Sequence, residues 1–446
     1  MKKFLAIILC VAVSISCFGI LSGCQNRNEI LKIYNWGEYM DPDIIPVFES
    51  WYKENTGKKI KVQYNEYETN EDMFTQIYRK KKDYDLVCPS EYMLVRMAKA
   101  NLLLELDADT KRAVTQNVSS NVYDLLEAAF DEDYMKYTVP FVWGTLGIMY
   151  NSKSAGLNDE IASHWDVLWN SQFQNKIFMK DSVRDSYTIA MINYYKNELL
   201  ELLETDTNAY RAKLESILYQ INNEEINKAK TLLTQQKSLV RAYEVDSAKD
   251  DMLNDVNGDK GYIGAFWSCD AGYIMSLSEQ DANLNLRYVV PKEGANVWVD
   301  SFVIPKYAKN TTAANLFLQF ICNYDKFNTE NNNMLDTDKY GDIAFLNMDY
   351  IGSTTCVESS MLAYKEYLMW LNEAQSEEEL KDEDGNIDEF DRTAWDNLKN
   401  APAEFFDMYI EMLFPTDEIL NRCAVMRDVE EFNTALDEMW LDVRID

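Results

Sequence analysis

The sequence of 446 residues contains a single histidine, His164, and lacks the short motifs by which many enzymes are recognised. It has no H-E-x-x-H motif for a catalytic zinc, no G-x-S-x-G motif for a serine nucleophile and no G-x-G-x-x-G motif for a dinucleotide. His164 lies in the segment SHWDVLW, where we expect a surface or helix-capping residue rather than a general base. An enzymatic interpretation is therefore left with carboxylates, which serve glycoside hydrolysis only when two of them converge.

Basic residues are also scarce. The chain has 43 Lys and Arg against 75 Asp and Glu, a formal net charge of −32. A field of this sign repels nucleic acid and anionic membrane surfaces, so we expect no nucleic-acid partner and favour a cationic or neutral one. The simpler alternative is that the acidic surface keeps a secreted protein soluble.

Cysteines are few and widely separated, without the C-x-x-C spacing of a zinc site or the density of a disulfide framework. Two of them, Cys10 and Cys17, belong to the N-terminal apolar segment, and Cys24 ends it. For the others we expect burial as small hydrophobic residues: Cys88, Cys269, Cys322, Cys356 and Cys423.

The N-terminus has the pattern of an export signal. Lys2 and Lys3 precede an uncharged apolar run, residues 4–21, which leads to LSGC ending at Cys24. The pattern resembles a bacterial lipobox, in which the cysteine is acylated, so we predict a lipoprotein signal peptide over residues 1–24 and a membrane tether through Cys24. The predicted location is extracytoplasmic, at the cell surface or in the periplasm. A plain membrane anchor is the alternative, but no second apolar run of about 20 residues follows.

Beyond a polar tether the chain alternates between strand-like and helix-like segments. The segments LKIYNW and IKVQYNEY predict strands, and the amphipathic stretch between them predicts a helix that stops at Gly57. A second unit of helix, strand and helix follows it, so we predict an α/β fold with a mostly parallel sheet. Extended segments at residues 137–151 and 296–305 predict crossings between domains, and residues 194–237 predict helix.

Residues 376–391 are acidic and poor in apolar side chains, which predicts an inserted surface loop. An EF-hand alignment centred on Gly385 would make Asp382, Asp384 and Asp391 calcium ligands. The first ligand position would then be Leu380, so we favour a solvated loop and predict no metal site.

Seven segments, in order, resemble the spermidine/putrescine-binding proteins of bacterial ABC importers. They are YNWGEY, YDLVCPSEYM, VPFVWGTLGIMYN, SHWDVLW, LVRAYEVDSAKDDM, AFWSCDAGYI and VWVDSFVIPKYAKN. The resemblance implies a two-lobed fold of the type II periplasmic binding class, each lobe a mixed sheet flanked by helices, with the ligand in the cleft between lobes. It implies one lobe from residues 25–141 and 298–352 and another from residues 142–297 and 353–446.

The same resemblance implies an aromatic-walled site with acids at intervals, without a cofactor. Its implied ligand-binding residues are Trp36, Glu38, Tyr39, Ser90, Tyr92, Asp185, Trp267, Asp270, Trp298 and Asp300. Each alone has a simpler interpretation: the tryptophans as core residues, Asp185 as a surface ion pair, and Asp270 as the cap of a helix beginning at Ala271.

The chain departs from the family pattern at three positions. Ser182 stands at the position of a family acid, which favours a shorter or less charged amine. Cys269 stands where a glycine is usual, and Ser353 where some relatives have an aromatic residue.

The implied function is capture of a protonated polyamine, putrescine or spermidine, by a monomer that delivers it to an ABC permease. Two rivals remain open at this point. The fold could bind another small solute, such as an amino acid derivative or a sugar, or the chain could be a secreted carboxylate-dependent hydrolase.

Overall fold

The computed structural model describes residues 26–130, 132–244, 263–277, 284–382 and 385–445. The predicted signal peptide and the lipidation site at Cys24 lie outside these ranges. So do Asp384 of the calcium alignment and most of the segment LVRAYEVDSAKDDM. Within the ranges, none of the helices combines the length and the apolar character that a membrane crossing requires.

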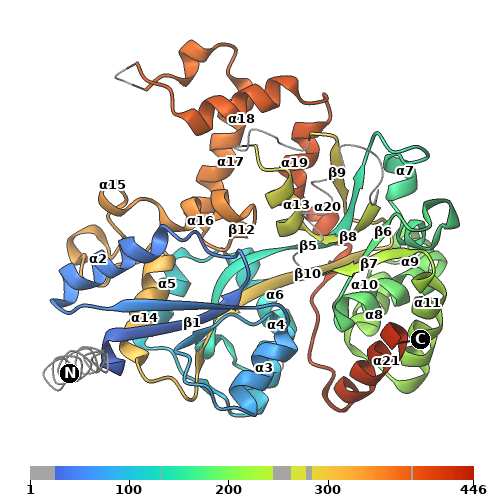
Figure 1. The fold of residues 1–446 in the computed structure, drawn as a ribbon, viewed down its shortest axis with the longest axis horizontal. Helices are drawn as coiled ribbons and strands as arrows, with labels where there is room; N and C mark the ends of the chain where they lie inside the picture. Colours follow the sequence, from blue (N-terminus) through green and yellow to red (C-terminus); the bar gives the residue numbers. More distant parts are fainter. Residues whose placement is uncertain (1–25, 131, 245–262, 278–283, 383–384, 446) are drawn as a thin grey trace, which may run out of the picture.

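The N-terminal part is built on a parallel sheet of order β2-β1-β3 (Figure 1). Its strands and the intervening helices are β1 (Ile30–Trp36), α2 (Ile44–Thr56), β2 (Lys61–Tyr67), α3 (Asn70–Tyr78), β3 (Leu86–Val87) and α4 (Glu91–Lys99). The predicted strand, helix, strand unit is confirmed. Helix α2 ends where expected, because Gly57 adopts a left-handed φ of 69° that few other residues tolerate.

Two long strands join this part to the rest. Strands β5 (Val139–Asn151) and β10 (Ala295–Phe302) pair antiparallel and extend across the molecule in Figure 1. They belong to an eight-stranded sheet of order β13-β10-β5-β8-β6-β7, in which β9 and β12 also pair with β5. The sheet is thus mixed, and the expectation of a mostly parallel sheet was wrong for β5 and β10. The implied lobe boundaries fall in β5, in β10 and just before β12, and they stay a prediction.

The other strands of this sheet are short. They are β6 (Ile177–Lys180), β7 (Val240–Glu244), β8 (Ile263–Trp267), β9 (Leu286–Val289), β12 (Thr354–Thr355) and β13 (Cys423–Ala424), while β4 (Leu103–Leu104) pairs with β11 (Ile304–Pro305) outside it. Strand β6 pairs parallel with both β7 and β8, an arrangement that requires long connections between the strands.

Residues 194–237 are helical, as predicted, but divided. The helices are α8 (Val183–Tyr194), α9 (Lys196–Thr205), α10 (Thr207–Tyr219) and α11 (Asn223–Lys237). The side chains of Asp206 and Asn222 accept backbone N–H bonds at the starts of α10 and α11, so each of these interruptions is a capped helix start. The C-terminal helix α21 (Asn433–Ile445) packs on α8 and α11.

The remaining helices follow in chain order. They are α5 (Ala108–Asn117), α6 (Ser120–Ala129), α7 (Asp159–Ala162), α13 (Ser268–Ile274), α14 (Thr311–Ile321), α15 (Thr337–Tyr340), α16 (Ile343–Ile351), α17 (Glu358–Glu373), α18 (Glu389–Asn400), α19 (Phe405–Leu413) and α20 (Asp417–Leu420). Helices α17 and α18 project from the body at the top of Figure 1. The predicted acidic loop between them is shorter than expected, because α18 already begins at Glu389.

The cysteine prediction is confirmed. Cys88, Cys269, Cys322, Cys356 and Cys423 are all buried free thiols, and the described residues form no disulfide. Burial raises the pKa of the Cys322 and Cys423 thiols to about 12, which keeps them neutral and unreactive.

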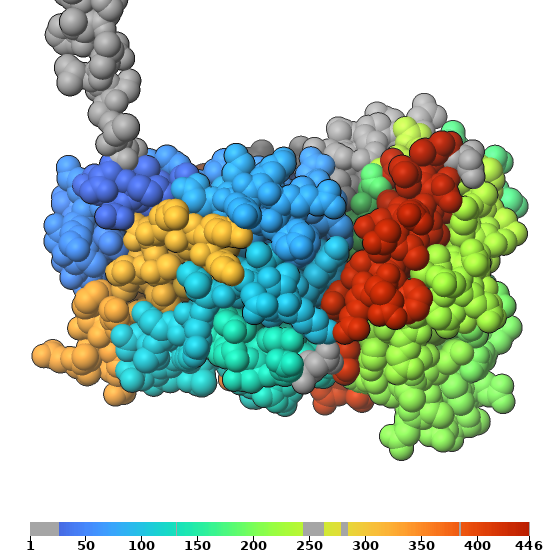
Figure 2. Space-filling view, turned by 90° about the horizontal axis from the view of Figure 1, so that it is seen from below, coloured from blue at the N-terminus to red at the C-terminus, as the bar shows by residue number. Residues whose placement is uncertain are grey.

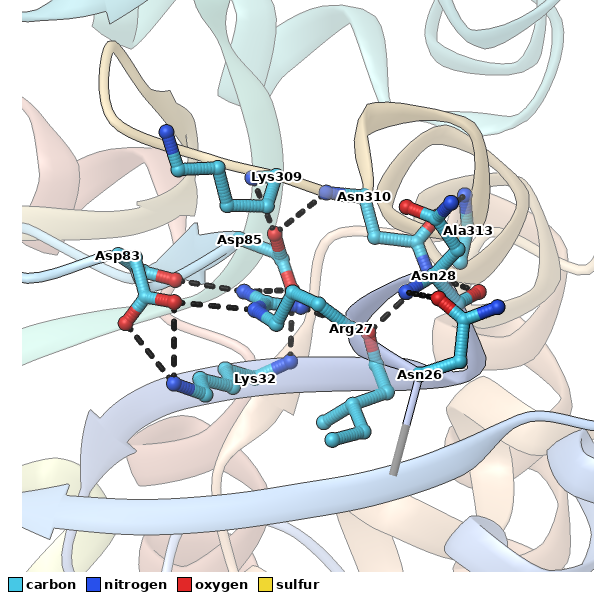
Figure 3. A network of polar contacts seen from close by, with 10 residues as sticks. Asn26, Arg27, Asn28, Lys32, Asp83, Asp85, Lys309, Asn310 and Ala313 are labelled. Carbon is cyan, nitrogen blue, oxygen red and sulfur yellow. Dashed lines mark hydrogen bonds and ion pairs between the residues drawn. The ribbon is translucent and has the colours of Figure 1, made fainter. Parts of the chain in front are cut away.

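A buried carboxylate fixes the start of β1 to the rest of the N-terminal part (Figure 3). Asp85, fully buried, forms an ion pair of 2.9 Å with Arg27 and accepts the backbone N–H groups of Lys32, Lys309 and Asn310 at 2.8 to 2.9 Å. The contacts join the first described residues, strand β1 and the N-terminus of α14. Because each of these donors would otherwise be left without an acceptor, Asp85 holds three chain segments together.

We expect Asp85→Asn to lower the free energy of unfolding by about 3 kcal/mol, since it leaves buried donors facing an amide. Urea denaturation followed by circular dichroism measures the change. The matched control is Asp83→Asn, which removes a carboxylate that contacts Arg27 and Lys32 but is 37% exposed. A loss below about 1 kcal/mol is expected there, and equal losses in the two variants would contradict this account.

Candidate functional site

A cavity of about 630 Å³ lies where the N-terminal part meets the helices that follow β5. This volume is within the range of small-molecule sites, roughly 300 to 1,000 Å³. Figure 2 shows the C-terminal segment, in red, running between the blue and cyan N-terminal part and the yellow-green helices. Helix α21 contributes Trp440 and Arg444 to the lining. We call this cavity the cleft.

The cleft collects residues that follow the carboxyl ends of parallel strands. Trp36 ends β1, Ser90 follows β3 as the N-cap of α4, and Ser182 follows β6 as the N-cap of α8. Ligands of open α/β sheets bind at this edge, because the chain turns there into helices and exposes side chains and backbone N–H groups.

All the predicted site residues line this one cleft: Trp36, Glu38, Tyr39, Ser90, Tyr92, Asp185, Trp267, Asp270, Trp298 and Asp300. Asp270 lies in the first turn of α13, whose N-cap is Trp267, so the alternative of a capping role was wrong. Asp185 is buried in the first turn of α8 and is no surface residue. That these side chains bind a ligand stays a prediction.

Asp300 is a deeply buried acid of the cleft. It is 6% exposed, and its Oδ2 atom accepts the hydroxyl of Tyr39 at 2.8 Å. Burial raises its pKa to about 7, an effect that the Ser90 and Tyr39 hydroxyls oppose. The other oxygen, Oδ1, is buried and has no hydrogen-bond partner among the described residues. An unpartnered buried carboxylate oxygen is costly, so this position is suited to a donor supplied by a ligand.

Asp185 lies near the end of β8. Burial raises its pKa, while hydrogen bonding from Ser182, the Lys180 ammonium and hydrogen bonding from Trp267 lower it. The negative charge of Asp185 in turn raises the pKa of Asp300. The two acids therefore interact across the cleft, and a cation between them would relieve their repulsion.

Asp270 differs because a cation of the protein itself already contacts it. The ammonium of Lys180 lies 3.1 Å from Asp270 Oδ2 and 3.3 Å from the centroid of the Trp267 ring. Lys180 is 1% exposed. Asp270 and one face of Trp267 thus hold a protonated amine of the chain.

A polar cluster lies beside Ser90. The Asn70 amide donates to the hydroxyls of Ser90 and Tyr92, each at 3.0 Å. The neighbouring Glu91 is buried and accepts the backbone N–H of Val299 at 3.1 Å, and burial raises its pKa to about 8. Glu91 is therefore protonated over most of the neutral range and adds little negative charge.

Aromatic rings form the walls. The Trp36 ring lies 4.7 Å from that of Tyr67, and Trp36 and Trp298 have buried Nε1 atoms without a hydrogen-bond partner among the described residues. Trp298 fits because the facing residue of β5 is Gly144. A Cβ atom at Gly144 would lie 2.6 Å from Trp298 Cζ2 and would also collide with the Ser268 hydroxyl.

Several lining residues escaped sequence reasoning. Arg184, next to the predicted Asp185, lines the cleft, and Lys180 lies behind Asp270. Trp440 and Arg444 come from the C-terminal helix. The apolar neighbours of Lys180 in strand β6 gave a weak signal that its side chain is buried. Nothing in the sequence indicated that α21 reaches the cleft.

His164 lies elsewhere. It is the N-cap residue of the 3-10 helix Trp165–Trp169, and its Nδ1 atom lies 2.9 Å from the Glu293 carboxylate. Of the described residues, no group of three His, Cys, Asp or Glu is arranged to hold a metal ion. The cleft presents buried acids and aromatic walls, with a buried lysine behind one of the acids, and acids beside aromatic faces can bind an organic cation.

A sequence profile of the bacterial extracellular solute-binding proteins matches residues 49–332, more than half of the chain. The chain belongs to this family of solute-binding proteins. Proteins of this family bind substrates for transport.

Two curated relatives are similar over most of their length. The solute-binding protein is 28% identical over 311 residues to the spermidine/putrescine-binding periplasmic protein of Salmonella typhimurium, covering 69% of this chain and 76% of the relative. It is 27% identical over 328 residues to SpuD, the putrescine-binding periplasmic protein of Pseudomonas aeruginosa, covering 72% and 80%.

Solved structures confirm the predicted fold of the type II periplasmic binding class. PotD, the spermidine/putrescine ABC transporter substrate-binding protein of Streptococcus pneumoniae, superposes with a TM-score of 0.59 at 25% identity, covering 94% of this chain and 99% of PotD. The TpPotD lipoprotein of Treponema pallidum superposes with a TM-score of 0.62 at 19% identity, covering 94% and 100%.

The Gly144 position leads to a test of how the aromatic wall is held. We expect Gly144→Ala to destabilise the solute-binding protein by about 1 to 3 kcal/mol, because a methyl group there displaces the Trp298 ring. The melting temperature and the tryptophan emission spectrum measure the two effects.

Gly385→Ala is the control, a glycine with no atom within 4 Å of its Cβ position. Its backbone has a φ of 83°, so alanine there costs some stability through the backbone alone. The Trp298 ring is not displaced in this variant, and its emission should match that of the wild type. An unchanged spectrum in Gly144→Ala would contradict the packing described.

Proposed function

We propose that this solute-binding protein captures a protonated polyamine, putrescine or spermidine, outside the cytoplasm and delivers it to an ABC permease. The observation that carries the proposal is the pairing, in one cleft, of the buried acids Asp185 and Asp300 with the aromatic walls of Trp36, Trp267 and Trp298. The names of the relatives from Salmonella, Pseudomonas and Streptococcus support it.

A polyamine requires this combination because it is a hydrocarbon chain with a protonated amine every few carbons. Each ammonium that leaves water loses several kcal/mol of hydration unless a carboxylate replaces it. Aromatic faces cover the methylenes and attract the cations by roughly 0.5 to 2 kcal/mol each. The unpartnered Oδ1 of Asp300 supplies one acceptor, and Asp185, which lies across the cleft, supplies another.

The proposed mechanism is closure of two lobes on the ligand. One lobe contributes Trp36, Tyr39 and Ser90, the other contributes Asp185 and Trp267, and the long strands β5 and β10 connect them. A ligand that contacts both lobes stabilises the closed state over the open one by the contacts that only closure forms. The ligand is released unchanged, and the chain acts as a monomer tethered by lipid at Cys24.

One observation favours a second candidate ligand. Arg184 lines the cleft, is 2% exposed, and its Nε and Nη1 atoms have no hydrogen-bond partner among the described residues. Its Nη2 atom donates to the backbone oxygens of Leu218 and Arg427 at 3.0 to 3.1 Å. A solute bearing both an amine and a carboxylate, such as an amino acid derivative, would satisfy Arg184 as well as the acids.

Asp300→Asn tests the proposal directly. We expect the variant to bind putrescine and spermidine at least tenfold more weakly, because a charged hydrogen bond contributes about 1.5 to 3 kcal/mol. Isothermal titration calorimetry of the mature chain with putrescine, spermidine, spermine and a basic amino acid measures the affinities. No binding of any polyamine by the wild type, with binding of the amino acid, would favour the second candidate.

A matched control exists in the same chain. Asp349 is a half-buried acid that accepts a tyrosine hydroxyl, from Tyr364 at 2.9 Å, but it does not line the cleft. Asp349→Asn should therefore leave polyamine affinity within twofold of the wild type. Retained affinity in Asp300→Asn, or an equal loss in both variants, would refute the proposed site.

The pKa of Asp300, about 7, predicts a pH dependence. An ammonium ligand binds the ionised carboxylate, so affinity should rise about tenfold from pH 6 to pH 8, with release of a proton on binding at the lower pH. Glu91, whose pKa is about 8, ionises at a higher pH than Asp300 and so extends the rise in affinity above pH 8. Calorimetry in buffers of different ionisation enthalpy measures both quantities. An affinity that is flat over this interval would contradict the prediction.

The same pKa has the opposite effect on the free protein. Because burial raises the folded-state pKa of Asp300 from 3.8 to about 7, the folded chain binds more protons than the unfolded chain between these values. The contribution of Asp300 to the stability of the free protein is therefore full below about pH 4 and is lost as the pH rises through 7.

A further inference from the structure

Lys180 lies behind the lining of the cleft and contacts two of its lining residues. It is the last residue of β6, and its side chain is 1% exposed between the cleft residues Asp270 and Trp267. Its ammonium lies 3.1 Å from Asp270 Oδ2, 3.3 Å from the Trp267 ring centroid and 6.0 Å from the Phe266 ring centroid. An acid and an aromatic face together are the arrangement that binds one protonated amine.

The chemistry of this contact is that of a polyamine end. A lysine side chain is four methylenes and an ammonium, the same group that ends putrescine. The acid and aromatic face that Lys180 occupies therefore cannot also accept an ammonium of the ligand, because two cations would share one carboxylate. Moving Lys180 away would transfer a buried charge from a strand end into solvent and leave Asp270 unpaired.

The other buried acids of the cleft set how many ligand charges it can neutralise. Four acids in the lining are less than a tenth exposed: Glu91, Asp185, Asp270 and Asp300. Lys180 neutralises Asp270, and Glu91 accepts a backbone N–H and is largely protonated at neutral pH. Asp185 lies in the field of Lys180 and Arg184, but neither Asp185 nor Asp300 forms an ion pair within 4.0 Å with a residue that the structure describes, so these two carboxylates remain for the ligand.

Two half-buried acids of the lining face cations of the chain. Glu71 accepts the Tyr92 hydroxyl at 3.4 Å and lies in the field of Arg184, whose charge opposes the rise that burial gives its pKa. Asp181 forms an ion pair with Arg444 at 2.6 Å. The ion pair with Arg444 disfavours a further cation at Asp181. Glu71 is only half-buried, and an ammonium contact there contributes little, so neither acid provides a third ammonium site.

We propose that Lys180 determines specificity: by occupying the site of Asp270 and Trp267, it restricts the cleft to an amine with two ammonium groups and disfavours triamines. The inference rests on the proposed polyamine function and deepens it. A diamine such as putrescine places one ammonium at Asp300 and the other at Asp185. A third ammonium would have to stay among exposed acids of the rim, such as Glu38, Asp72 and Asp437. Exposed pairs of this kind contribute little.

The first test uses the wild-type chain and needs no variant. Titration calorimetry is performed with putrescine, spermidine and butylamine, which carry two, three and one ammonium groups. We expect putrescine to bind at least tenfold more tightly than either of the others. If all three fail to bind, the polyamine function itself is wrong. If they bind and spermidine equals or exceeds putrescine, the function stands and the role of Lys180 is overturned.

The second test changes the lysine. Lys180→Met replaces the lysine by an unbranched side chain of similar length without a charge, which frees Asp270. The ratio of spermidine affinity to putrescine affinity should therefore rise at least tenfold. Lys180→Met/Asp270→Asn removes both charges and should lose this gain, because no third carboxylate is then free. Lys180→Arg keeps a cation and should retain the preference for the diamine.

A merely structural role of the ion pair gives a different result. Both single Lys180 variants would then change the melting temperature of the free protein while leaving the ratio of spermidine to putrescine affinity as in the wild type. An unchanged ratio in a folded Lys180→Met protein therefore overturns the proposal. If Lys180→Met does not fold, the ratio of spermidine to putrescine affinity is measured in Lys180→Gln instead. A ratio equal to that of the wild type then overturns the proposal.

Discussion

The antiparallel pairing of β5 with β10 is the constraint on which the cleft depends. Strand β10 carries both Trp298 and Asp300, and its register against β5 places Trp298 opposite Gly144 and Asp300 opposite Val142. The register shifts between Asp300 and Ser301, and such irregularities are common beside functional sites, where they change the direction of a side chain. Because the same strands extend between the two parts of the chain, the pairing that orders the site also connects the parts that are proposed to close on it.

Electrostatics then decide what the cleft can hold. Burial alone would favour neutral acids, and it does raise the pKa values of Glu91, Asp185 and Asp300. A cationic solute reverses this preference by replacing the lost hydration with a direct contact. The chain has already placed one such cation, Lys180, against Asp270, and a second, Arg184, lies 4.8 Å from the Tyr92 ring centroid. The charge available to a ligand is thus smaller than the number of acidic residues suggests.

Sequence reasoning recovered the fold class and the ten lining residues because family motifs and local periodicity carry them. The motif AFWSCDAGYI placed Trp267 and Asp270 together, and the amphipathic stretch that stops at Gly57 defined α2. Local pattern did not recover the mixed sheet, since the antiparallel pairing of β5 with β10 joins residues about 150 positions apart and leaves no periodic signal of its direction. Nor did it recover the contribution of α21 to the cleft, which results from packing on α8 and α11.

The sequence by itself determined the alternation of strands and helices, the burial of the scattered cysteines and the chemical kinds of side chain at the strand ends. These properties follow from local pattern, because apolar spacing, caps and glycine conformation act within a few residues. Only the tertiary structure decided which acids remain available to a ligand. That depends on whether a cation from another element, here Lys180 of β6 against Asp270 of α13, comes within contact distance, and no local pattern specifies a contact between residues that are 90 positions apart.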